Sequence, residues 1–256
     1  IVSVRVNRPD MRRPFPPDLV HALTGATVSG LSRRAKYGLI HTDRDHALVF
    51  HLGMSGRWRI DPEQDETHDH LVIETAHHRF ALNDPRRFGS VDLLLAPELD
   101  RWKPFAALGP EPLGDALTAV HLREATKGRK PAIKLLLLDQ RVVAGLGNIY
   151  VCEALWRARL SPRRSAGTLV TKAGGPTRRL GDLALHIRET IADAIRAGGS
   201  TLRDHRQVDG DLGYFQHSFA VYGREDEPCL RPACRGVVKR IVQSGRSTFF
   251  CPLCQR

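Results

Sequence analysis

The sequence predicts a multidomain α+β protein with a β-rich N-terminal part, a helical middle part and a cysteine-rich hairpin at the end. Three observations carry this prediction. Short segments of alternating apolar and polar residues dominate up to about Leu95. Longer segments with helical periodicity follow a Pro- and Gly-containing stretch, Pro104 to Gly114, which reads as a linker. Two pairs of cysteines close the 256-residue chain.

The β-rich part contains short apolar segments that Gly, Pro, Asp and Asn interrupt. This pattern is typical of a sandwich or a barrel. The first segment, Ile1 to Val6, alternates apolar and polar residues as a half-buried strand does. The other expected strands span residues 38–42, 47–52, 71–74, 78–82 and 90–95. A loop at residues 9–17 and a short helix at residues 18–23 are also expected.

The middle part is expected to form helices at residues 117–126, 132–139, 148–159 and 177–196. In the last of them, apolar residues recur at helical spacing and would share one buried face. These residues are Leu180, Leu183, Ala184, Ile187, Ile191 and Ile195. Gly198 and Gly199 should end this helix, because glycine readily adopts the left-handed conformation found at helix C-termini.

The four terminal cysteines, Cys229, Cys234, Cys251 and Cys254, have the spacing C-x4-C-x16-C-x2-C. Two cysteine pairs held one hairpin apart can present four thiolates as a tetrahedron, the geometry of structural zinc. The segment between the pairs reads as two strands joined by a turn that presents Arg246. Two disulfides are the alternative, but nothing suggests export, so we expect one structural zinc ion. With four protein ligands, this zinc would have no open position for catalysis.

The chain is strongly basic, with a formal charge of +11 and a pI of about 10.0. This charge indicates an acidic partner, with nucleic acid the first candidate and an anionic membrane the second. No apolar run reaches membrane-spanning length, and no signal peptide is recognisable. The fifth cysteine, Cys152, lies in an apolar helical pattern and is expected to be a buried, inert thiol.

A tight turn between two expected helices, Gly145-Leu146-Gly147, is followed by Asn148. A helix that begins here would expose free backbone N–H groups, which form a ready site for phosphate. Asn148 could cap that helix or contact the phosphate itself. The alternative is an ordinary corner between two helices.

Two further turns carry unusual side chains. Met54 lies in a Gly-flanked turn, and Arg86 and Phe88 lie at a strand–turn junction. Bulky side chains on turn tips can enter a duplex and occupy the space left by an extruded base. The alternative is that Met54 and Phe88 fill the core. A basic cluster around Lys36 precedes a strand, and its alternative is a solvated run of charges.

Together these motifs resemble bacterial formamidopyrimidine-DNA glycosylase, a family that repairs 8-oxoguanine. The resemblance rests on residues 33–37, 51–56, 84–89 and 145–150 and on the four cysteines, in that order. It implies an N-terminal β-sandwich, a helix–two-turn–helix domain and a zinc ribbon. The corresponding boundaries are 1–108 for the sandwich, 109–220 for the linker and helical domain, and 221–256 for the ribbon. DNA would bind in the cleft between the lobes.

The resemblance also implies roles for individual residues. Lys36 matches a lysine that serves β-elimination and contacts phosphate, and Arg246 matches a phosphate ligand and δ-elimination donor. Met54, Arg86 and Phe88 match the void-filling residues, with Arg86 facing the orphaned cytosine. Other DNA-contacting positions are matched by His51, His68, Arg129 and Asn148. Lesion-side positions are matched by Lys134, Thr201 and Tyr214, the last two in a capping loop of residues 200–217.

The family begins with Pro-Glu, whereas Ile1 of this sequence aligns inside the first sandwich strand. In the family, the proline amine attacks C1′ of the damaged nucleotide and the glutamate handles protons. An amine nucleophile forms a Schiff base at C1′, which permits elimination of the 3′ and then the 5′ phosphate. We therefore expect the polypeptide that begins at Ile1 to bind DNA without appreciable glycosylase activity. A form that begins with Pro-Glu is expected to remove 8-oxoguanine.

The expected function is base-excision repair by a DNA glycosylase and abasic-site lyase that acts on oxidised purines. An endonuclease VIII-like enzyme for oxidised pyrimidines is the alternative, and the resemblance of residues 200–217 to a lid over 8-oxoguanine favours the purine enzyme. A non-catalytic damaged-DNA-binding protein is a third reading. The expected partner is double-stranded DNA with oxidised bases, and no membrane. We expect a monomer in the bacterial cytoplasm, associated with the nucleoid.

Overall fold

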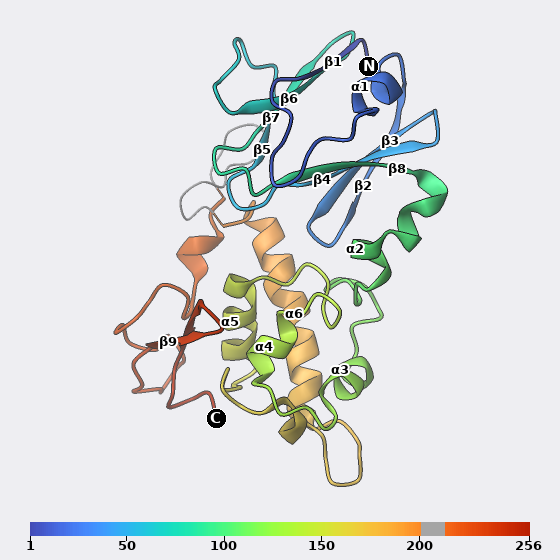
Figure 1. Cartoon of the computed structure of the whole chain (residues 1–256). Helices are drawn as coiled ribbons and strands as arrows, with labels where there is room; N and C mark the ends of the chain where they lie inside the picture. The colour runs from blue at the N-terminus through green and yellow to red at the C-terminus, as the bar shows by residue number, and fades with distance from the viewer. Residues whose placement is uncertain (201–212) are drawn as a thin grey trace. The chain divides into compact units, whose positions relative to one another are not determined.

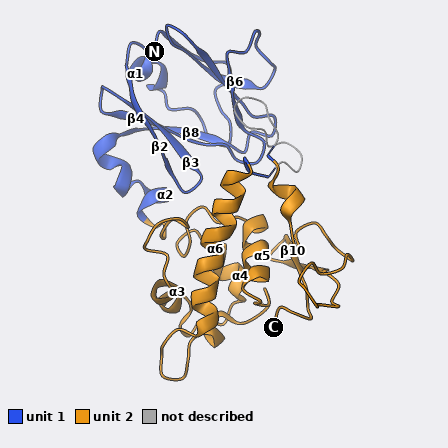
Figure 2. Ribbon diagram, turned by 180° about the vertical axis from the view of Figure 1, so that it is seen from behind, with its two compact units in different colours: residues 1–106, 198–213 blue, residues 107–197, 214–256 orange. Residues whose placement is uncertain are grey.

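The structure is a computed structural model that describes residues 1–200 and 213–256. The chain forms two compact units (Figure 2). Unit 1 comprises residues 1–106 and 198–213, and unit 2 comprises residues 107–197 and 214–256. The first break, after Ala106, falls inside the stretch expected as a linker. The cysteine-rich hairpin belongs to unit 2.

Unit 1 contains two antiparallel sheets with the strand orders β1-β6-β7-β5 and β2-β3-β4-β8 (Figure 1). The strands are β1 (Ser3–Val6), β2 (Val28–Arg34), β3 (Tyr37–Thr42), β4 (His46–His51), β5 (Arg57–Ile60), β6 (Asp69–Glu74), β7 (Arg79–Asn83) and β8 (Ser90–Leu95). Short helical segments accompany them: α1 (Leu19–Leu23), the 3-10 turn η1 (Ala96–Arg101) and α2 (Lys103–Ala106). Helix α2 replaces the beginning of the expected linker.

The two sheets of unit 1 share one apolar core, which makes the unit a β-sandwich and not a barrel. The first sheet contributes Leu71 and Leu82 to this core, and the second contributes Leu48 and Val91. Leu19 of α1 is completely buried against the same cluster. The sandwich reading is confirmed, since each sheet keeps two separate edge strands.

The sequence does not reveal β2 and β5. Strand β2 exposes most of its side chains and contains Gly30, so it lacks apolar alternation. Strand β5 is only Arg57-Trp58-Arg59-Ile60, in which two charged residues conceal the pairing with β7. Both are edge strands, where one side of the backbone has no neighbour and the apolar pattern is weaker.

Unit 2 packs its helices around a second core. They are α3 (Ala119–Thr126), α4 (Ile133–Leu137), α5 (Asn148–Arg157) and α6 (Arg178–Arg196), with 3-10 turns η2 (Ala166–Leu169) and η3 (Phe215–Ser218). Each α-helix lies within its expected range. On α6, Leu180, Leu183 and Ile187 are completely buried. Ile195 was expected on this face but is 62% exposed, because in the last turn of α6 it is Ala194 that packs inward, against Phe215 and Phe219.

The C-terminal hairpin consists of β9 (Lys239–Gln243) and β10 (Arg246–Phe250). Ser244 and Gly245 join them with φ angles of 47° and 72°, the positive values that a two-residue hairpin turn favours. Val238 and Phe249 enter the core of unit 2. Within the part of the chain that the structure describes, no helix is both long and apolar enough to cross a membrane.

Candidate functional site

One end of the sheet β2-β3-β4-β8 gathers several predicted residues. The strand register places Tyr37 opposite His51, and His51 opposite Ser90. Lys36 lies in the turn between β2 and β3, directly before Tyr37, and its ammonium acts electrostatically on His51. Lys36 and His51 are distant in the sequence, so only strand pairing brings them together.

His51 is held as a neutral ring at this end of the sheet. The Gly53 backbone N–H donates to its Nδ1 at 2.9 Å, so the ring proton resides on Nε2. Burial lowers the pKa of His51 below its usual 6.5, and the positive charges of Lys36, Arg12 and Arg13 lower it further. His51 can therefore present a neutral N–H donor at neutral pH.

Arg12 and Arg13 are functional candidates that the sequence analysis missed. The Arg12 backbone N–H donates to the Gly89 carbonyl at 3.1 Å, which places the loop of residues 9–17 beside the start of β8. The Arg13 guanidinium donates to a hydroxyl and a carboxylate on β8. Both charges act on His51. Their only signal in the sequence is a basic doublet in a Pro-containing loop, which by itself predicts nothing about position.

The side chains of Met54 and Phe88 are exposed to solvent. This excludes the alternative that they fill the core. Their exposed fractions are 64% and 44%. The Arg86 guanidinium carbon lies 4.9 Å from the centroid of the Phe88 ring, a cation–π contact. Gly53, with φ +66°, lets the two turns approach, because an added Cβ would lie 2.6 Å from the Phe88 carbonyl carbon.

A buried carboxylate, Asp84, ties these two turns together. Its Oδ1 accepts the Ser55 hydroxyl at 2.6 Å, and its Oδ2 accepts the Gly89 N–H at 2.7 Å. The Ser55 Oγ accepts the Arg86 backbone N–H at 3.2 Å. Since Asp84 is completely inaccessible, the network is shielded from water and should hold both turns rigidly.

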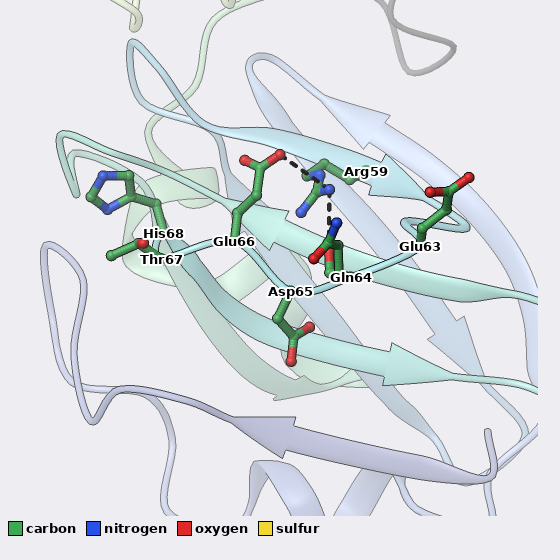
Figure 3. A pocket seen from close by; sticks show the side chains of 7 residues that line it. All are labelled: Arg59, Glu63, Gln64, Asp65, Glu66, Thr67 and His68. Atoms are coloured by element: carbon green, nitrogen blue, oxygen red, sulfur yellow. Dashed lines mark hydrogen bonds and ion pairs between the residues drawn. The ribbon is translucent and has the colours of Figure 1, made fainter.

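His68 lies on the polar loop between β5 and β6, where Figure 3 shows its side chain at one end of a pocket and Glu63 at the other. The pocket is lined by Arg59, Glu63, Gln64, Asp65, Glu66, Thr67 and His68. An ion pair of 3.1 Å joins Arg59 and Glu66. The carboxylates make this pocket unfavourable for phosphate. However, the His68 carbonyl accepts the Asp84 N–H at 3.0 Å, which keeps His68 beside the turns described above.

In unit 2, the turn before α5 is held by Gln140. Its Oε1 accepts the Gly145 N–H at 2.8 Å, and its Nε2 donates to the Leu146 carbonyl at 3.1 Å. Gly147 is the N-cap of α5, and Asn148 is the first helical residue. The Asn148 side chain makes no cap hydrogen bond; its amide donates to the Ser247 carbonyl on β10 at 2.9 Å.

Lys134, which was expected on the lesion side, is buried in this structure. Its side chain is completely inaccessible, and its Nζ donates to Thr248 Oγ1 at 2.6 Å and to the Ser247 carbonyl at 3.3 Å. Burial lowers the pKa of Lys134, and the nearby positive charge of Arg246 acts in the same direction. Lys134 thus supports strand β10 from below, at the same carbonyl that Asn148 contacts.

Other predicted residues of unit 2 lie at its surface. Arg246 is exposed at the tip of the β9–β10 hairpin, and Arg129 is exposed in the loop after α3. The Arg129 carbonyl accepts the Gly167 N–H at 2.8 Å, which holds that loop in place. Tyr214 is 65% exposed, and its N–H donates to the Ala197 carbonyl at 2.8 Å. Thr201 and most of the expected capping loop lie outside the described residues.

The four cysteines form a cluster that fits a zinc ion. Their sulfur atoms all lie within 4.8 Å of one another, and the Cys229–Cys254 and Cys234–Cys251 sulfur pairs are both separated by 3.8 Å. A tetrahedron with Zn–S bonds of about 2.3 Å has sulfur–sulfur edges of about 3.8 Å. The geometry matches zinc and excludes disulfides, whose sulfur atoms lie about 2 Å apart.

Three family models match successive parts of the chain. The formamidopyrimidine-DNA glycosylase N-terminal domain matches residues 1–91, and the formamidopyrimidine-DNA glycosylase H2TH domain matches residues 108–206. A zinc finger found in FPG and IleRS matches residues 226–256. The first match covers most of the β-sandwich, and the third contains all four cysteines.

Relatives of known name and solved structures agree with these matches. The chain is 62% identical to the formamidopyrimidine-DNA glycosylase of Erythrobacter litoralis and 63% identical to that of Novosphingobium aromaticivorans, covering 100% of this chain and 92% of each relative. A Lactococcus lactis FPG mutant in complex with Fapy-dG-containing DNA is 32% identical, with a TM-score of 0.89 over 100% of this chain and 92% of that one. The MutM (FPG) protein from Thermus thermophilus is 37% identical, with a TM-score of 0.85 over 99% and 90%.

Proposed function

The chain belongs to the formamidopyrimidine-DNA glycosylase family, and we propose that it excises oxidised purines from duplex DNA and then cleaves the strand at the abasic site. The observation that carries this proposal is 62% identity to a formamidopyrimidine-DNA glycosylase over the whole chain. A similar solved structure contains Fapy-dG DNA, and another, a MutM protein, contains carbocyclic 8-oxo-G DNA. These relatives favour the purine enzyme over the oxidised-pyrimidine alternative.

Phosphate binding is assigned to the end of the β2-β3-β4-β8 sheet and to the hairpin of unit 2. Lys36 supplies positive charge at the first place, and His51 supplies a neutral N–H donor. Arg246 supplies charge at the second, beside the N-terminus of α5 that begins at Asn148. Such contacts give affinity for any sequence, as a repair enzyme that scans DNA requires. His68 and Arg129 are proposed as further contacts.

The exposed turn tips are proposed to enter the duplex. Met54 and Phe88 offer apolar bulk, and Arg86 offers hydrogen-bond donors beside the Phe88 ring. A base that leaves the stack costs a few kcal/mol, which side chains occupying the vacated space can offset. The buried Asp84 network supports this role, since its hydrogen bonds fix the two turns relative to each other. Tyr214 and Thr201 are proposed to lie on the lesion side.

The chemistry follows from amine attack on C1′ of the damaged nucleotide. The N–C1′ bond of the enzyme forms as the bond to the base breaks, and the base leaves with a proton. The C1′–O4′ bond then breaks, with O4′ taking up a proton, which leaves an iminium between the enzyme amine and C1′. Loss of a C2′ proton from this iminium expels the 3′ phosphate, and a second elimination expels the 5′ phosphate. We assign Lys36 to the first elimination and Arg246 to the second, because each can stabilise a departing phosphate dianion.

Zinc in this enzyme has a structural role. Four thiolates complete its coordination, so it holds the hairpin that presents Arg246. We further propose that the enzyme acts as a monomer, since one glycosylase site needs one flipped nucleotide. Its substrate is chromosomal DNA, which places its work at the nucleoid of the bacterial cytoplasm.

A duplex with 8-oxoguanine opposite cytosine tests the proposal. The complete gene product, including any residues that precede Ile1, should release the base, cut the strand and be trapped on DNA by borohydride. An undamaged duplex and one with an oxidised pyrimidine serve as controls. Release of the oxidised pyrimidine without release of 8-oxoguanine would overturn the purine assignment. Binding without any base release would instead support a non-catalytic DNA-binding protein.

A further inference from the structure

The zinc cluster has a neighbour that the chemistry above does not use. Trp156, near the C-terminal end of α5, directs its indole N–H to the sulfur of Cys229, with a distance of 3.4 Å from Nε1 to Sγ. Sulfur acceptors form hydrogen bonds at such longer distances because the atom is larger. The Trp156 side chain is half-buried against the core of unit 2, so the indole cannot swing freely.

Arg231 holds the same indole from the other side. Its guanidinium carbon lies 4.5 Å from the centroid of the Trp156 ring, and it donates to the Trp156 carbonyl at the end of α5. A cation at this place also complements the negative end of the helix dipole. Arg231 lies between the first two cysteines, where the Cys234 N–H donates to its carbonyl at 3.0 Å. The four-residue spacing between Cys229 and Cys234 thus provides the loop that carries Arg231.

The contacts of Trp156 and Arg231 compensate the negative charge of the zinc site. Four thiolates around one Zn²⁺ carry a net charge of −2, which a protein must compensate with N–H donors or cations. Arg231 supplies a cation and also approaches the Cys254 thiol as a donor. The Gly236 N–H donates to the Cys234 sulfur at 3.4 Å. Trp156 supplies the equivalent donor to Cys229 from a helix outside the ribbon.

We propose that Trp156 and Arg231 form an outer shell of the zinc site. This shell joins the loop between Cys229 and Cys234 to helix α5, which begins at Asn148. The indole N–H withdraws charge from the Cys229 thiolate, and Arg231 fixes the ring in the orientation that permits this. Helix α5 therefore carries Asn148 near one end and a zinc-directed donor near the other. Both Trp156 and Arg231 are positioning residues, since neither is among the four metal ligands.

The sharpest test observes the hydrogen bond in the native protein. The full chain is prepared with ¹¹³Cd in place of zinc at the four cysteines, and the indole N–H signals are recorded by NMR. The Trp156 signal should show a scalar coupling to ¹¹³Cd transmitted through the sulfur. The signals of Trp58 and Trp102, which lie in unit 1, should show none. An uncoupled Trp156 signal in cadmium-loaded protein would overturn the proposal.

A substitution tests the consequence for the metal. Trp156→Phe keeps an aromatic ring at this position but removes the indole N–H donor. It should lower zinc affinity in a chelator competition by about 10- to 100-fold. Its cobalt form should show the thiolate-to-metal band at lower energy, because an unbonded sulfur gives up charge more easily. Trp102→Phe, in unit 1, is the matched control and should change neither readout. Unchanged affinity and spectrum in Trp156→Phe would refute the role.

Arg231→Ala keeps the inference testable if the tryptophan variant folds poorly. It removes the cation that packs on the Trp156 ring and leaves the indole in place, and should also lower zinc affinity. Failure of both variants to release zinc faster than the wild type would overturn the proposal. Since these readouts concern metal and not base excision, they remain distinct from the test of the proposed function.

Discussion

His51 is proposed to contact phosphate without carrying charge. Its Nδ1 accepts the Gly53 N–H, so Nε2–H is the group available to DNA. We predict that His51→Ala weakens binding to any duplex by about 1 kcal/mol, the contribution of one ordinary hydrogen bond. The slope of log affinity against log salt should stay unchanged, because a neutral donor releases no counterion. A salt titration of both proteins measures this, and a reduced slope would indicate a protonated His51.

We also predict that His51 makes the stability of the folded protein depend on pH. The pKa of His51 is lowered in the folded state from 6.5, first by burial and then by Lys36, Arg12 and Arg13. As the pH falls below 6.5, the unfolded chain takes up this proton before the folded chain does. The stability contributed by neutral His51 is therefore present above pH 6.5 and is lost as the pH falls through the folded-state pKa. Urea unfolding should show a smaller loss on acidification in His51→Gln than in the wild type.

Arg246 should behave differently from His51, because it carries charge. We predict that Arg246→Ala weakens binding to every sequence and reduces the salt slope by about 0.9, the value for one phosphate contact. Arg141→Ala is a suitable control, since Arg141 is exposed but already paired with Asp139 at 2.6 Å. Equal slopes for the wild type and Arg246→Ala would remove Arg246 from the phosphate-binding set.

At the scale of elements, the two turns near the end of the β2-β3-β4-β8 sheet act as one piece because of Asp84. Asp84→Asn replaces one acceptor oxygen by a donor that faces either Ser55 or the Gly89 N–H. We predict a loss of about 2 to 3 kcal/mol in the free energy of unfolding, typical of a broken buried charged hydrogen bond. Denaturant unfolding measures this loss. Asp100→Asn, an exposed residue of the same unit, should change stability little.

We expect the side chains at the tips of these turns to act after the protein has bound DNA, when the lesion is extruded, and not during binding itself. Removing the Arg86 side chain takes away the cation above Phe88 but leaves the Asp84 network intact. We predict that Arg86→Ala binds undamaged duplex nearly as the wild type does but extrudes the lesion less. A fluorescent base analogue at the lesion reports extrusion directly. Equal fluorescence changes in both proteins would exclude Arg86 from this role.

At the scale of the whole molecule, apolar contacts join the zinc-binding hairpin to the helical core. Val238 and Phe249 belong to both, so losing the metal should disturb more than the ribbon. We predict one zinc per chain, and we expect Cys251→Ser to lose zinc and DNA binding together. Metal analysis and a binding titration measure the two losses, and far-UV circular dichroism should show the β-sandwich retained. Cys152→Ser is the control, because Cys152 is a buried cysteine outside the cluster and should leave zinc in place. Purified wild-type protein without zinc would contradict the prediction.

Local patterns alone determined the fold class and much of the candidate site. Cysteine spacing predicted the metal ligands, and helical periodicity predicted α6 from its apolar stripe. The Gly-Leu-Gly turn predicted where α5 begins, since a helix start depends on a few adjacent residues. The exposed positions of Met54 and Phe88 could be proposed from their turns but not decided, because a sequence does not state which side chains reach solvent.

The tertiary structure decided what depends on distant pairing and burial. Strand register placed Lys36 near His51, and a backbone hydrogen bond from Arg12 to Gly89 placed the loop of residues 9–17 beside β8. No periodicity could reveal either placement. Packing buried Lys134 beneath β10, where its ammonium donates to Thr248, and no local pattern could reveal this. The contact of Trp156 with Cys229 likewise joins residues far apart in the chain. The physical reason is common to all of them: backbone conformation depends on neighbours in sequence, whereas pKa, burial and hydrogen bonding depend on neighbours in space.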